Sequence, residues 1–180
     1  MVDMVIDSSL RTVEWKDNKV IMIDQTKLPN QLVFVTYDDY NQVADAIRNL
    51  VVRGAPAIGV SGAFGLALAS LQSKATTKDE LISDLEKARK ILYDTRPTAV
   101  NLKWGLDKIM KVANSGDIVD QIKQSVINES KKMAEEDIQI NKTMGKYGSV
   151  LFDNNDTIMT HCNAGALATV AYGTALGVIR

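Results

Sequence analysis

The chain has 180 residues, of which 46% are hydrophobic and 24% charged, and its formal net charge is -1. This composition is typical of a soluble globular protein with one domain, or with one domain and part of a second. The charge is close to neutral and no predicted face gathers lysine and arginine, which argues against a nucleic-acid-binding surface.

The chain shows no sign of export or of a membrane span. The uncharged stretches 56–73 and 157–179 contain Gly, Ser, Thr and Asn, which favours a buried helix and a buried strand-turn-helix unit. Residues 1–10 include two Asp and no apolar core of a signal peptide. Cys162 is the single cysteine, so no internal disulfide forms. We therefore expect a cytoplasmic protein that does not bind membranes.

The chain begins with a pattern of strands. Residues 11–15 and 20–24 flank a turn at 16–19 that contains Asn18, a residue type that tolerates positive φ. Residues 32–36 predict a third strand. A short antiparallel sheet follows from this pattern.

Helical spacing then takes over. Asp38 or Asp39 is a candidate cap for a helix whose apolar residues recur at helical spacing, namely Val43, Ala46, Ile47, Leu50 and Val51. Gly54 and Pro56 end this helix and begin another. Residues 77–80 form a capping box, which predicts a helix with Leu81, Leu85, Ala88 and Leu92 on one face.

Two further helices and a change of domain are predicted beyond this point. Pro97 starts a helix with Leu102, Leu106, Ile109 and Ala113 in register, residues 114–117 end it, and a longer, more polar helix covers 118–147. The turn-rich segment 152–156 suggests a domain boundary, between a mostly helical domain with a small sheet (1–152) and the start of another (153–180). In the latter, 157–159 predict a strand, 160–165 a tight turn and 165–179 a buried helix. The predicted fold class is thus an α+β N-terminal domain followed by the first βα unit of an α/β domain.

Two arginines each stand directly before a helix that proline opens. Arg53 precedes Gly54 and Ala55, where free backbone N–H groups and a guanidinium together suit an anion. A helix-helix corner with a solvated arginine explains the same residues. Arg96 precedes Pro97, and two such places suggest one shared anion such as a phosphoryl group, unless Arg96 pairs with Asp94.

Cys162 lies after the predicted strand, where ligands collect in α/β sheets, and close to a predicted helix N-terminus, which favours a thiolate. An inert buried thiol is the alternative. His161 is not expected to form a dyad with Cys162, because neighbours along an extended chain point to opposite faces. One Cys and one His build no zinc site, so we expect no metal.

Three segments in this order resemble the signatures of S-methyl-5-thioribose-1-phosphate isomerases. They are Arg-Gly-Ala-Pro-Ala-Ile-Gly at 53–59, Thr-Arg-Pro-Thr-Ala-Val-Asn-Leu at 95–102, and Thr-His-Cys-Asn-Ala-Gly-Ala-Leu-Ala-Thr at 160–169, which Tyr-Gly-Thr-Ala-Leu-Gly at 172–177 extends. The resemblance implies a helical N-terminal domain with a short antiparallel sheet and a Rossmann-like second domain. The same superfamily includes ribose-1,5-bisphosphate isomerases and regulatory subunits of the exchange factor for translation initiation factor 2.

The resemblance also implies roles for particular residues. Arg53, Gly54, Ala55 and Arg96 would hold the phosphate of a phosphorylated sugar, and Cys162 would be one of two catalytic groups, with no cofactor. The second group is an Asp in a Gly-Ala-Asp-Arg-Ile motif, which this sequence lacks. We therefore expect this chain to be an inactive fragment, about half of an aldose-ketose isomerase of methionine salvage. The non-catalytic regulatory subunit and the ribose-1,5-bisphosphate isomerase remain alternatives.

The segment 157–180 is apolar on every side. Without a sheet to cover it, it would expose Leu167, Val170, Tyr172, Leu176 and Ile179. We expect it to form a homodimer or to dock onto the N-terminal domain.

Overall fold

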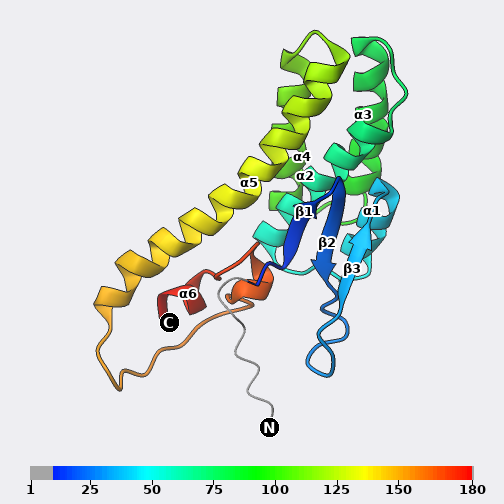
Figure 1. The fold of residues 1–180 in the computed structure, drawn as a ribbon. Helices are drawn as coiled ribbons and strands as arrows, with labels where there is room; N and C mark the ends of the chain where they lie inside the picture. The colour runs from blue at the N-terminus through cyan, green and yellow to red at the C-terminus, as the bar shows by residue number, and fades with distance from the viewer. Residues whose placement is uncertain (1–9, 180) are drawn as a thin grey trace.

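The computed structural model describes residues 10–179, which form a small sheet, a helical bundle and a C-terminal segment that returns to both (Figure 1). Strands β1 (Val13–Lys16), β2 (Lys19–Ile23) and β3 (Phe34–Tyr37) are antiparallel in the order β1-β2-β3. Val13 pairs with Met22, and Val20 pairs with Trp15 and Tyr37. The predicted hairpin and third strand are confirmed.

Two residues are enough to form the turn of this hairpin. Asp17 and Asn18 have φ values of 51° and 57°, the left-handed pair that matches the twist of two adjacent antiparallel strands. The sheet then covers the helices with one face. Val13, Val20 and Met22 are fully buried, and the Trp15 ring lies 5.7 Å from the Phe64 ring, between centroids.

The centre of the bundle is α2 (Ala55–Gln72), which is buried almost continuously from residue 57 to residue 70. Alone among helices of residues 10–179, α2 is long and apolar enough to cross a membrane, yet 78% of it lies inside the protein. A helix that is apolar all round fits such a central position. Helix α1 (Tyr40–Arg48) packs beside it, and Asp39 caps α1 by accepting a hydrogen bond from the Asn41 N–H.

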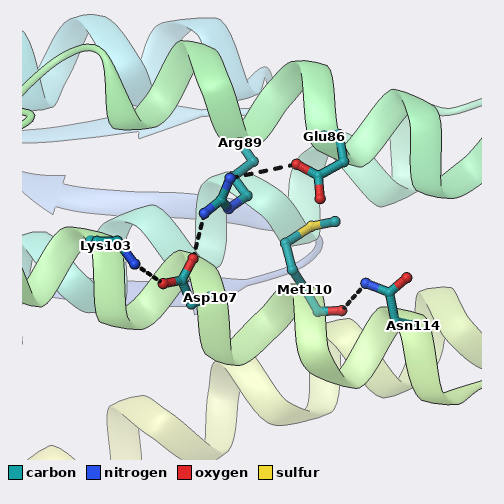
Figure 2. A network of polar contacts seen from close by, with 6 residues as sticks. All are labelled: Glu86, Arg89, Lys103, Asp107, Met110 and Asn114. Atoms are coloured by element: carbon teal, nitrogen blue, oxygen red, sulfur yellow. Dashed lines mark hydrogen bonds and ion pairs between the residues drawn. The ribbon is translucent and has the colours of Figure 1, made fainter.

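Helices α3 (Lys78–Tyr93) and α4 (Val100–Ser115) cover other sides of α2. The capping box at the start of α3 is present, with Thr77 accepting from the Glu80 N–H. A polar network ties α3 to α4 (Figure 2): Arg89 of α3 lies 2.5 Å from the Asp107 carboxylate, which Lys103 also contacts at 2.5 Å. The helix predicted from Pro97 begins instead at Val100, because residues 96–99 form a turn closed by the Ala99 N–H on the Arg96 carbonyl.

The longest helix, α5 (Val119–Gly148), confirms the helix predicted over 118–147. Its first half packs against α2 and α4, and its second half extends away from the bundle (Figure 1). A 3-10 turn, η1 (Ser149–Leu151), follows it. The chain then runs back under the sheet to a second 3-10 turn, η2 (Ala166–Ala168), and to the short helix α6 (Ala175–Ile179) beside α5.

The βα unit predicted for the C-terminal segment is not formed in the described residues. Residues 157–159 are irregular and largely exposed, and the helix predicted over 165–179 is replaced by η2 and the five residues of α6. A parallel strand needs neighbouring strands for its N–H and C=O groups, and the three strands of residues 10–179 form a separate antiparallel sheet. Without a sheet, the following helix has no surface to cover.

Instead, part of this segment docks onto the helical domain. Val170 is fully buried, and Leu167 and Tyr172 are half-buried, so the expected docking onto the N-terminal domain is confirmed for these three residues. Leu176 and Ile179 do remain exposed, each at 41%. The apolar segment has therefore buried its middle against the N-terminal domain.

Candidate functional site

The start of α2 has an open N-terminus preceded by a glycine in a left-handed conformation. Gly54 is the N-cap of α2, with φ of 94°, and no side chain caps the helix there. Pro56 stands in the first turn, where its missing N–H costs nothing. The backbone N–H groups of such a turn carry partial positive charge and suit an anion. The structure thus supports the predicted local geometry around Gly54 and Ala55.

Segment 160–169 meets this turn directly. A Cβ atom at Gly54 would lie 2.3 Å from the Ala168 Cα and 2.4 Å from the Ala168 carbonyl oxygen. Only glycine permits two backbones to approach so closely. Two of the three motifs found in the sequence, separated by more than a hundred residues, are therefore in van der Waals contact.

The third motif lies at the start of α4, next to α2. A Cβ atom at Gly59 would lie 2.8 Å from the Asn101 carbonyl oxygen, and one at Gly105 would lie 2.5 Å from the Gly59 carbonyl oxygen. These two glycines therefore let α2 and α4 cross in close contact. Because Arg53 and Arg96 precede α2 and α4 by a few residues each, the crossing brings both arginine-bearing helix starts to one region.

Both arginines are available for a ligand. Arg53 is exposed and Arg96 is half-buried. Within residues 10–179, neither has a carboxylate within 4.0 Å, so the alternative ion pair between Asp94 and Arg96 does not form. Asp94 pairs with Lys90 instead, at 2.6 Å along one face of α3.

Cys162 is exposed and adopts φ of 64°, an unusual conformation for a residue with a side chain. The turn after it is fixed by the Ala164 carbonyl, which accepts hydrogen bonds from the Thr174 N–H at 2.9 Å and the Leu176 N–H at 3.2 Å. The buried thiol considered as an alternative is excluded by this exposure. The predicted helix N-terminus beside Cys162 is also wrong, since only the three-residue turn η2 follows.

Other features of the described residues do not point to a different site. No cluster of three His, Cys, Asp or Glu residues suited to a metal ion occurs within 10–179. Clefts lie along the start of α3, along the outer face of α4 and beside the sheet, and none of these is lined by Arg53, Arg96 or Cys162.

Sequence reasoning missed three polar residues that hold the C-terminal segment in place. Thr12 and Gln25 flank the first two strands, and Asp137 lies on α5. A signal for Asp137 was present: it stands with Ser130 and Asn141 on the otherwise apolar, buried face of α5. The sequence offers no such signal for Thr12 and Gln25, because their hydrogen-bond partners are backbone groups about 150 residues away.

The environment of Asp137 is apolar enough to affect its titration. Burial raises the pKa of the Asp137 carboxyl, and the hydrogen bond from the Val170 N–H opposes this rise. Desolvation disfavours the charged form of a carboxyl group, so burial has the larger effect here.

The chain is similar to curated methylthioribose-1-phosphate isomerases. It is 47% identical over 174 residues to the one from Geobacter metallireducens and 46% identical to the one from Geobacter sulfurreducens, covering 96% of this chain and 50% of each relative. A relative from Archaeoglobus fulgidus described as a putative methylthioribose-1-phosphate isomerase is 45% identical. The chain thus spans about half the length of the curated relatives it matches.

Two solved structures share its fold. The 5-methylthioribose 1-phosphate isomerase from Pyrococcus horikoshii matches with a TM-score of 0.88 and 47% identity, over 94% of this chain and 48% of that one. A structure described as translation initiation factor eIF-2B, subunit delta, from A. fulgidus matches with a TM-score of 0.86 and 46% identity, over 95% of this chain and 50% of that one. These matches confirm the predicted antiparallel sheet and helical domain as part of this fold. The model of the initiation factor 2 subunit family matches residues 51–180, well over half of the sequence, and the chain belongs to that family.

Proposed function

We propose that this chain supplies the phosphate-binding region and one catalytic group of a methylthioribose-1-phosphate isomerase. The contact between Gly54 and Ala168 is the observation that carries the proposal, because it joins an anion-type helix start to the cysteine-bearing motif. The similarity to curated isomerases over almost the whole chain supports it.

In this proposal the phosphate group binds at the start of α2. The N–H groups of Gly54 and Ala55 donate to its oxygens, and Arg53 and Arg96 supply positive charge. Bidentate contacts from guanidinium groups orient a phosphate as well as bind it. Fixing one end of the sugar in this way contributes to catalysis by positioning the reacting carbons.

The chemical step is an aldose-ketose conversion. The phosphate on the anomeric oxygen blocks simple ring opening, so an acid must protonate the ring oxygen before hydrogen moves from C2 to C1. That transfer oxidises C2 to a carbonyl and reduces C1. Cys162 can exchange one proton, as a general acid or base, and a second group must act elsewhere on the sugar. A hydride shift in an apolar pocket gives the same product, and both mechanisms need the phosphate held.

The whole enzyme, as proposed, extends beyond this chain. We place the boundary between its two domains near residues 152–153, and we propose that it is a cytoplasmic homodimer. The Asp of the Gly-Ala-Asp-Arg-Ile motif is not in this sequence, so the chain alone should bind the sugar phosphate without converting it.

Calorimetric titration of methylthioribose 1-phosphate into the chain tests the proposal. Arg53→Ala and Arg96→Ala should each weaken binding about tenfold or more, the usual effect of losing a charge-assisted hydrogen bond. Arg48→Ala is the matched control, because Arg48 is exposed on α1 and pairs with Asp45. Equal affinity in all three variants would show that neither Arg53 nor Arg96 binds the phosphate. Turnover by the chain alone would show that no second catalytic group is needed.

A second candidate is a non-catalytic regulatory subunit, which the likeness to the A. fulgidus structure favours. Such a subunit has no chemical need for an exposed thiol beside a phosphate site. Ribose-1,5-bisphosphate isomerase is a third candidate, and competition between the two sugar phosphates in the same titration distinguishes it.

A further inference from the structure

Three polar side chains from different parts of the fold hold the backbone of residues 166–170. Thr12 donates its hydroxyl to the Ala166 carbonyl at 2.9 Å, and Gln25 donates its amide to the Leu167 carbonyl at 2.8 Å. The Asp137 carboxylate accepts from the Val170 N–H at 2.7 Å. We call Thr12, Gln25 and Asp137 the clamp.

The members of the clamp are shielded from water. Thr12 is 1% exposed and Gln25 is 7% exposed, and Asp137 is half-buried beneath the segment that it binds. Thr12 adds a backbone bond, since its own N–H donates to the Val170 carbonyl at 2.8 Å. Hydrogen bonds of this kind leave buried groups unsatisfied when one partner is removed, so the clamp should fix its segment firmly.

The clamp acts on peptide groups and not on side chains. It therefore determines the path of the backbone, whatever side chains residues 166–170 carry. Ala168, in the middle of the clamped segment, is the residue that touches Gly54. Cys162 lies only six residues before Ala168, and six residues reach at most about 20 Å.

We propose that Thr12, Gln25 and Asp137 are positioning residues that hold Cys162 beside the start of α2. The inference rests on the proposed function, because it assigns the clamp to the geometry of that reaction. None of the three is among the residues proposed to bind the sugar phosphate. They act by keeping segment 166–170 against Gly54, and with it the turn that carries the thiol.

The single cysteine allows a direct test on the chain itself. A nitroxide spin label on Cys162, which is exposed, should broaden the NMR amide signals of Gly54 and Ala55. In Asp137→Ala that broadening should be largely lost, and exchange of the Val170 amide hydrogen should become about tenfold faster, because its hydrogen-bond acceptor is gone. Asp137→Asn keeps an acceptor oxygen and should retain both signatures.

Ser130→Ala is the control for a general loss of stability. Ser130 is also on α5, and its buried hydroxyl bonds the Ala63 and Val126 carbonyls without touching segment 166–170. The Ser130→Ala substitution should lower the melting temperature and leave the broadening of the Gly54 amide signal unchanged. If Asp137→Ala does not fold, Thr12→Val, which preserves shape and removes one hydroxyl, should reduce the broadening in its place.

Full broadening at Gly54 and Ala55 in a folded Asp137→Ala or Thr12→Val variant would overturn the proposal. The clamp would then only add stability. No substrate enters this experiment, so its result is independent of the ligand titration that tests the proposed function.

Discussion

Gly54 is the residue on which the proposed site depends most. Its positive φ and its contact with Ala168 are separate reasons for glycine, and the first alone would allow Asn at modest cost. The sequence shows a helix-breaking glycine here, but it cannot show which distant backbone lies against it. The proposed anion site rests on that contact.

Gly54→Ala should therefore destabilise the chain by about 1–3 kcal/mol, the usual cost of overpacking, and displace segment 166–170. Denaturant unfolding measures the loss. Gly165→Ala is the matched control, because its φ is not positive and its Cβ would meet only the end of the Leu176 side chain, at 3.1 Å. A Gly54→Ala variant as stable as Gly165→Ala would contradict the close approach.

Asp137 predicts a pH dependence of stability. Burial raises the pKa of its carboxyl in the folded state, so the folded protein holds this proton more tightly than the unfolded chain does. The free energy of unfolding should fall as the pH rises from the ordinary aspartate range through the raised pKa of Asp137. Below that window the group is protonated in both states and its contribution is fully present.

Asp137→Asn should remove this slope, which unfolding curves at a series of pH values will show. Four other carboxyl groups have pKa values below their ordinary range because of their hydrogen bonds, so their contributions to the free energy of unfolding are lost as the pH falls. They are those of Glu80, Asp84, Asp107 and Glu136. Their window lies at lower pH than that of Asp137. An unchanged slope in Asp137→Asn would show that Asp137 is not desolvated.

At the scale of elements, the crossing of α2 and α4 sets where the two arginines lie. The sequence predicted both helices, but nothing in it indicated that Gly59 and Gly105 face each other. Helix spacing identifies which residues of one helix are buried, and it contains no information on which helix covers them.

Gly105→Ala should push α4 away from α2, because the new Cβ would lie 2.5 Å from the backbone oxygen of Gly59. We expect a loss of about 1–3 kcal/mol and weaker binding of the sugar phosphate, since Arg96 moves with α4. Gly62→Ala is the comparison: its Cβ would meet the flexible ends of Leu102 and Leu106, and the smaller strain should leave affinity unchanged. Equal affinities of the two variants for the sugar phosphate would show that the crossing of α2 and α4 does not position the site.

The C-terminal segment marks the limit of prediction by element. Its pattern of small and apolar residues correctly indicated burial, and Val170 is fully buried. The pattern could not indicate which secondary structure the segment adopts, because a parallel strand forms only beside neighbouring strands. Where hydrogen-bond partners are distant in sequence, as for Thr12 and Ala166, local periodicity gives no warning.

For the whole molecule, an exposed apolar stripe is the most distinctive surface. Ile140, Met144 and Tyr147 lie at helical spacing on the projecting half of α5, and Leu151 continues the stripe at 76% exposure. Contiguous apolar surfaces of this kind mark interaction sites in soluble proteins. The homodimer was predicted through segment 157–180, whose helix α6 packs beside α5, and we expect such a dimer to cover part of this stripe as well.

Tyr147→Glu should therefore shift the chain toward monomer in size-exclusion chromatography with light scattering. Ile118→Glu is the matched control, since Ile118 is exposed next to the opposite end of α5. A monomer for the unsubstituted chain at all concentrations would contradict the dimer, whatever the variants do.

NMR titration of the chain with methylthioribose 1-phosphate is the most direct test of the central claim. That claim is that the start of α2, Arg96 and Cys162 converge around one phosphorylated sugar. The largest amide shifts should fall together on Gly54, Ala55, Arg96 and Cys162. Shifts confined to the cleft at the start of α3, around Ala75 and Ser83, or no shifts at saturating ligand, would contradict it.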